Sequence, residues 1–161
     1  MATVSPDVMI QPIGREPLRV VDQVSMFHLL LVVLDPYTYE SSWVLETAGR
    51  ILEDFREADC RAAFLVTADA KDAATFLGPW ADRQMVFIDP DRTTVKGLGL
   101  EKIPALIHIG NDASVIGKSE SWDPDGWREI TDNLSSMMSW SRPVFPIAGD
   151  PVAFEGSPAL G

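Results

Sequence analysis

The sequence predicts an α/β protein built as a three-layer α/β/α sandwich around a central mixed sheet. Short, continuous apolar runs of strand length recur along the chain, and amphipathic stretches of helix length separate them. Such runs are typical of strands that are buried on both faces by helices. The order is strand, helix, strand in the first half and strand, strand, helix in the second, which favours parallel pairs completed by one antiparallel hairpin.

The first half supplies two expected strands and two expected helices. The run "FHLLLVVL" contains the longest apolar stretch, "LLLVVL", and Asp-Pro follows it. After it, apolar residues recur every three to four positions between charged ones, which is the pattern of an amphipathic helix. Ser41 or Ser42 is the expected N-cap of this helix, and Asp69 that of the next, which Gly78-Pro79 closes. The expected elements are strand 27–34, helix 42–58, strand 60–68 and helix 69–77.

The second half is expected to end in a hairpin and a helix. "GNDAS" between two apolar runs is a hairpin turn signal. Asp123 is the expected N-cap of the last helix, with Pro124 in its first turn, where the missing N–H does no harm. The expected elements are strand 84–89, a short helix or turn at 93–100, strand 104–110, strand 114–119 and helix 122–141.

Prolines concentrate at the two ends of the chain and predict extended arms around a compact middle. We therefore expect an N-terminal arm at residues 1–17, one domain at 18–141 and a Pro-rich C-terminal tail at 142–161. The tail also carries six large apolar residues, which segments that stay unfolded usually lack. It is expected to dock on its own domain or on another chain; the six residues are Val144, Phe145, Ile147, Val152, Phe154 and Leu160.

Composition excludes several classes of function. The formal net charge of -11 argues against nucleic acid or anionic membranes as partners and favours a partner with a basic surface. The single cysteine, Cys60, excludes an intramolecular disulfide and an all-cysteine metal site. The sequence shows neither a secretory signal pattern nor an apolar run long enough to span a membrane, so a cytoplasmic protein is expected.

Several of these features together resemble the thioredoxin-like superfamily over about residues 18–140. "LLLVVLDP" leads straight into the loop before the first long helix, and "GLGLEKIPALIHIGNDASVIG" is similar to the family's second half. A final amphipathic helix follows, as in the family. The resemblance implies a thioredoxin-like fold, with Pro104 after Ile103 as the cis-proline beside the family's active site.

The family's Cys-x-x-Cys redox motif is missing. Aligning "LDPYTYESSW" puts Thr38 and Ser41 at the two cysteine positions, with Tyr39 and Glu40 between them and Tyr37 where a tryptophan usually stands. A register one residue later gives Tyr39 and Ser42, and neither register supplies a thiol or a peroxidatic cysteine. A helix N-terminus lowers the pKa of a thiol, but an aliphatic hydroxyl stays protonated near neutral pH. The resemblance thus implies the location of an active site without its redox chemistry.

The leading interpretation is a redox-inactive thioredoxin-like domain that acts by protein–protein interaction, as an accessory subunit of a larger complex. In the family, this face and the segment before the cis-proline grip extended polypeptide. Tyrosine and tryptophan are also enriched in binding hot spots. The expected partner-binding residues are Tyr37, Tyr39, Trp43, Ile103 and Pro104.

The alternative interpretation is a thioredoxin- or peroxiredoxin-type oxidoreductase that uses Cys60 or a partner's thiols. A hydrolase built on Ser41 or Ser42 needs a base, and the two histidines, His28 and His108, fall inside apolar strands with no G-x-S-x-G motif nearby. The same histidines have no metal-ligand spacing. "DPDR" and "DPDG" resemble fragments of a calcium loop but lack its frame and are interpreted as turns. No catalytic residue, metal or cofactor is therefore expected.

Overall fold

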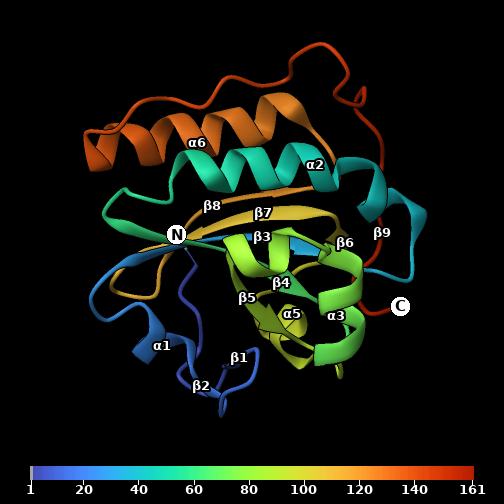
Figure 1. Cartoon of the computed structure of the whole chain (residues 1–161). Coiled ribbons are helices and arrows are strands. Elements are labelled where there is room, and N and C mark those ends of the chain that lie inside the picture. Colours follow the sequence, from blue (N-terminus) through green and yellow to red (C-terminus); the bar gives the residue numbers. More distant parts are fainter. Residues whose placement is uncertain (1) are drawn as a thin grey trace.

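The computed structural model describes residues 2–161 as a seven-stranded mixed sheet with helices on both faces (Figure 1). The strand order is β2-β1-β5-β4-β3-β7-β8, and a separate pair joins β6 to β9. This arrangement confirms the predicted α/β/α fold class. The elements are β1 (Met9–Pro12), β2 (Leu18–Arg19), α1 (Val20–Gln23), β3 (His28–Leu34), α2 (Tyr39–Asp54), β4 (Cys60–Val66), α3 (Ala70–Leu77), α4 (Trp80–Arg83), β5 (Met85–Ile88), α5 (Thr93–Gly97), β6 (Lys102–Ile103), β7 (Ala105–Ile109), β8 (Val115–Glu120), α6 (Pro124–Met138) and β9 (Ser157–Pro158).

Strand β3 lies inside the sheet, between β4 and β7, where a parallel pairing meets an antiparallel one. It pairs in parallel with β4, which pairs in parallel with β5, and it pairs antiparallel with β7 on its other side. The predicted hairpin forms between β7 and β8. Parallel neighbours require crossover connections, and α2 and the α3–α4 segment supply them. The apolar sequence of β3 is explained by this position, because the strand has a neighbour on each edge and a core on each face.

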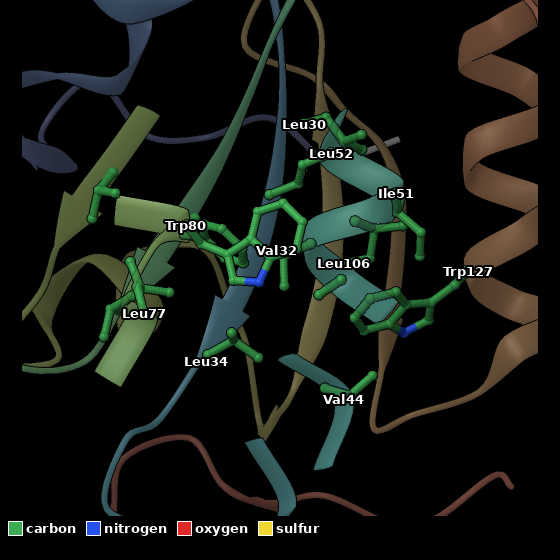
Figure 2. Packing of buried hydrophobic residues seen from close by; sticks show 14 of the residues in the cluster. Leu30, Val32, Leu34, Val44, Ile51, Leu52, Leu77, Trp80, Leu106 and Trp127 are labelled. Atoms are coloured by element: carbon green, nitrogen blue, oxygen red, sulfur yellow. The ribbon is translucent and has the colours of Figure 1, made fainter. Parts of the chain in front are cut away.

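Alternate residues of β3 feed two hydrophobic cores. Leu30, Val32 and Leu34 face the core under α2, α3, α4 and α6, and the residues between them face the core under α1, α5 and the N-terminal segment. Figure 2 shows the first core, to which α4 contributes Trp80 and α6 contributes Trp127. Each fully buried Val or Leu side chain contributes about 1.5–3 kcal/mol.

The N-terminal segment 1–17 was expected to be an arm outside the domain, and that expectation is wrong for most of its described part. Strand β1 pairs antiparallel with β5 and extends the sheet, while Val4, Val8 and Ile10 are buried in the second core. Pro12 stands at the end of β1, where a missing N–H is tolerated. The prolines therefore end a strand rather than keep the segment away from the core.

Helix α2 begins three residues earlier than predicted. Its N-cap is Thr38, whose backbone is extended, whereas Ser41 and Ser42 lie inside the first turn. Ser41 does not cap because its hydroxyl accepts the backbone N–H of Asp35 at 2.8 Å. The cap predicted for α3 is confirmed, since the Asp69 carboxylate accepts the N–H of Asp72 at 2.8 Å. Helix α6 begins as predicted, with Asp123 as its N-cap and Pro124 in its first turn, and it ends at Met138, before the predicted end at 141.

The C-terminal tail docks on its own domain. It leaves α6, runs back over the layer formed by α2 and α6, and ends beside β6 (Figure 1). Phe145 is buried in the first core, and the Asp150 carboxylate forms an ion pair with Arg50 of α2 at 2.7 Å. Strand β9 then pairs antiparallel with β6.

Candidate functional site

The loop between β3 and α2 is organised by one buried carboxylate, that of Asp35. One of its oxygens accepts the backbone N–H of Tyr37 at 3.0 Å, and the other accepts a guanidinium N–H of Arg92 at 2.9 Å. The Thr38 hydroxyl donates to the Asp35 carbonyl at 3.0 Å. Burying a charge is tolerated only where it is paired, so the Arg92 contact is what permits Asp35 to close this loop.

The four residues at the degenerate motif positions have different surroundings. Ser41 is fully buried, and its hydroxyl is occupied by Asp35. Thr38 and Glu40 are partly buried at the start of α2, where the negative charge of Glu40 is favoured by the helix dipole. Tyr39 is exposed. The serine that takes the second cysteine position therefore has a structural role in the loop.

Three aromatic side chains beside this loop face solvent and form what we call the aromatic patch: Tyr37, Tyr39 and Trp43. Their exposed fractions are 62%, 80% and 56%. The Tyr37 hydroxyl donates to Asp72 of α3 at 2.6 Å, and this bond raises the pKa of Tyr37 to about 12. Trp43 lies one turn after Tyr39 on α2 and contacts the ring of Phe154 edge-on, with centroids 5.3 Å apart.

Ile103 and Pro104, the other two expected partner-binding residues, are not exposed in the structure. Both are buried, and the peptide bond between them is cis. The Ile103 side chain lies in the second core, and its backbone edge is occupied by Ser157 of β9. A partner could therefore reach Ile103 and Pro104 only after β9, a segment more than fifty residues later, has left this edge, and their role in binding stays a prediction.

Cys60 lies far from the loop. It pairs in register with His28 at the first residue of β3, whereas the loop follows the last residue of that strand, about 20 Å away at roughly 3.3 Å per residue. Cys60 is 7% exposed, and burial, with a smaller contribution from Asp59, raises the pKa of its thiol to about 11. These surroundings disfavour the thiolate that redox chemistry needs.

The two histidines meet at the same far end of the sheet. His28 Nδ1 and His108 Nε2 are 2.8 Å apart, and burial together with His28 lowers the pKa of His108 to about 4. Neither ring can act as a base for Ser41, because the histidine pair lies at the first residue of β3, whereas Ser41 of α2 is bonded to Asp35, beyond the last residue of that strand. No group of three or more metal-ligating side chains occurs among residues 2–161.

Comparison with solved structures identifies this arrangement of sheet and helices. A candidate thiol:disulfide interchange protein DsbE from Chlorobium tepidum superposes with a TM-score of 0.68 and 11% identity, over 86% of this chain and 99% of that one. The chain has a thioredoxin-like fold. The thioredoxin domain of a thiol-disulfide oxidoreductase from Bacteroides vulgatus gives 0.61 and 10% identity, over 83% and 98%.

A second kind of neighbour covers the terminal segments as well. A hypothetical protein from Sinorhizobium meliloti matches 99% of this thioredoxin-like chain and 92% of its own, with a TM-score of 0.66 and 10% identity. No protein-family model and no curated protein matches the sequence. No helix in residues 2–161 combines the length and the apolar character that a bilayer crossing needs.

Sequence reasoning missed Arg92, which joins the loop to the tail. Besides pairing with Asp35, its guanidinium donates to the Ala159 carbonyl at 2.7 Å. Arg92 also has a left-handed backbone, with φ of 59°, and is the N-cap of α5. "DPDR" was interpreted as a turn, which it is, but a turn signal says nothing about where a long side chain reaches. The available signal was Asp35 itself, because a carboxylate that directly follows a buried strand needs a cationic partner.

Proposed function

We propose that this thioredoxin-like domain has no thiol chemistry of its own and acts by binding a protein partner through the aromatic patch. The observation that carries the proposal is the contrast at the β3–α2 loop. The oxygen side chain at the second motif position is buried and bonded, while the three aromatic rings around it are exposed. Exposed Tyr and Trp side chains bury a large area on binding at little entropic cost.

The charge around the patch supports a partner with a basic surface. Glu40 lies between Tyr39 and Ser41, and Asp72 accepts the Tyr37 hydroxyl. The whole chain carries a net charge of -11, so its field attracts a cationic protein and speeds the encounter. A role as an accessory subunit of a cytoplasmic complex is part of the same proposal.

Redox inactivity is supported by the position of Cys60. An oxidoreductase that used this thiol would have to act from a buried site about 20 Å from the loop. An insulin-reduction assay on the full chain and on its Cys60→Ser variant tests this part. We expect both to stay at the background rate, and activity that is lost in the variant would instead establish the oxidoreductase.

The binding role is tested with a photo-reactive amino acid at position 39 in native cells. Position 26 is the matched control, because Met26 is also an exposed apolar residue, 79% exposed, but precedes β3 at the opposite end. We expect a defined cross-linked partner from position 39 and none from position 26. With that partner purified, Trp43→Ala should weaken binding by about 2 kcal/mol, roughly 30-fold in Kd, and Met26→Ala should leave it unchanged. A footprint centred on residue 26 would refute the proposal.

A further inference from the structure

We propose that the edge formed by β6 and the end of β8 is a peptide-binding groove whose resident ligand is the chain's own distal tail, residues 153–161. An extended peptide from a partner then binds there only by displacing this segment. This proposal rests on the proposed function, in which the chain binds protein partners. Beyond that function, it names a second binding surface beside the aromatic patch and the kind of peptide that fits it.

Backbone hydrogen bonds hold the distal tail along the edge formed by β6 and the end of β8, in the same way that an added peptide strand is bound. The Phe154 N–H and carbonyl exchange bonds of 3.1 and 3.0 Å with Trp122, and the Ala159 N–H donates to the Glu101 carbonyl at 2.8 Å. Between these points, Ser157 pairs with Ile103. Added strands of this kind draw affinity from main-chain bonds and specificity from alternate side chains.

Three positions of the tail give the groove its specificity. The ring of Phe154 rests edge-on against Trp43, and Ala159 is 1% exposed among the residues of the second core. At Gly156 the backbone approaches so closely that an added Cβ would lie 2.4 Å from the Ile103 carbonyl oxygen. The groove therefore selects an extended peptide with an aromatic residue, a glycine two positions later and a small residue three positions after that.

The distal tail is held by polar contacts, such as the bond from Arg92 to the Ala159 carbonyl and the bond from the Gly156 N–H to the Ser121 hydroxyl, but it buries less apolar surface than the segment before it. Residues 145–151 bury Phe145, clamp Asp150 against Arg50, and accept a bond from the Trp122 indole at the Pro151 carbonyl. Beyond them Ala159 is the one fully buried side chain of the segment. A methyl group of this size contributes about 1 kcal/mol. The distal tail should therefore open locally at a free energy well below that of global unfolding.

Adding a single methyl group at Gly156 should release the distal tail from the groove in the full-length chain. Gly156→Ala should expel the distal tail, because the neighbour it meets is backbone, whereas Ala153→Ser on the exposed part of the tail is the matched control. Hydrogen exchange reports the release: the amides of Phe154 and Ala159 should lose protection in Gly156→Ala while those of β3 keep it. Protection equal to that of the unmodified chain at both amides would overturn the proposal.

The ligand chemistry is then tested with a labelled synthetic peptide of residues 152–161. In the unmodified chain the tethered tail competes at an effective concentration of about a millimolar. We expect the peptide to bind the Gly156→Ala chain at least tenfold more tightly than the unmodified chain or the Ala153→Ser chain. A peptide that itself carries Gly156→Ala should bind none of them.

Two results would contradict the groove. One is equal affinity of the peptide for all three chains; the other is equal binding of the two peptides. If the Gly156→Ala chain does not fold, a Phe154→Ala chain, which loses only the ring against Trp43, carries the same comparison. Because the probe is the chain's own tail, failure here leaves the aromatic-patch proposal standing, and failure of the patch cross-linking leaves this one standing.

Discussion

Replacing Asp150 with asparagine should loosen the tail where it crosses α2. The Asp150 carboxylate accepts two bonds from the Arg50 guanidinium at 2.7 Å each, one from the Thr47 hydroxyl at 2.8 Å and one from the Ile147 N–H at 2.7 Å. The Arg50 bonds contribute most and hold the pKa of Asp150 at about 2, below its usual value of 3.8. At 1.36 kcal/mol per unit, the ionised form contributes about 2 kcal/mol.

The pH dependence of this contribution has a definite sign. A carboxyl whose folded pKa is lowered stabilises the fold above its unfolded pKa, near 4, and loses that contribution as the pH falls toward 2. The difference in free energy of unfolding between the unmodified chain and Asp150→Asn should therefore be about 2 kcal/mol at pH 7 and shrink steadily below pH 4.

Urea unfolding at a series of pH values, followed by far-UV circular dichroism and tryptophan fluorescence, measures this difference. Glu155→Gln is the control, because Glu155 pairs with Lys102 at an exposed site and such pairs contribute little. A difference that stays constant from pH 7 to pH 2.5, or one below 0.5 kcal/mol at pH 7, would show that Asp150 does not carry the tail in the way the geometry indicates.

Three further predictions concern the loop and the thiol. Cys60 should react with a disulfide reagent about 100-fold more slowly in the folded chain than in urea, since raising its pKa from 9.0 to about 11 reduces the thiolate by that factor; equal rates would refute its burial. Arg92→Met should cost about 3–5 kcal/mol in urea unfolding, because it leaves the buried Asp35 charge unpaired, and a loss below 1 kcal/mol would contradict the pairing. Tyr37 should ionise near pH 12 in an ultraviolet titration, and Asp72→Asn should bring its pKa back toward 10.

The parts of the fold that the sequence predicted correctly are those with a local cause. Strand β3 was predicted because six consecutive apolar residues, Leu29 to Leu34, suit two cores, and α3 because its Asp69 cap is bonded as the residue type suggests. Strand β1 was missed because four residues that end in proline look like coil, and only pairing with β5 makes them a strand. The start of α2 was misplaced because Ser41 has a tertiary partner that no local pattern shows.

The candidate site divides in the same way. Exposure of Tyr37, Tyr39 and Trp43 is consistent with their place after a strand end, and their role in binding stays a prediction. The pairing of Ile103 with Ser157 was not predictable from its surroundings in the sequence, because the two residues are more than fifty positions apart. The absence of the two cysteines is visible directly in the sequence. That the tail occupies the edge formed by β6 could be learned only from the structure.

The two halves of the tail have different energetic roles, and this difference couples Asp150 to the groove. The ion pair between Asp150 and Arg50 fixes the chain just before the distal tail. The few residues that link Asp150 to the groove then keep the effective concentration of the distal tail high. Asp150→Asn should lower that concentration without touching β6 or Gly156. The free peptide of residues 152–161 should then bind the Asp150→Asn chain more tightly than the unmodified chain and less tightly than the Gly156→Ala chain. An affinity for Asp150→Asn no higher than for the unmodified chain would show that the distal tail is held by its own contacts alone, independent of this ion pair.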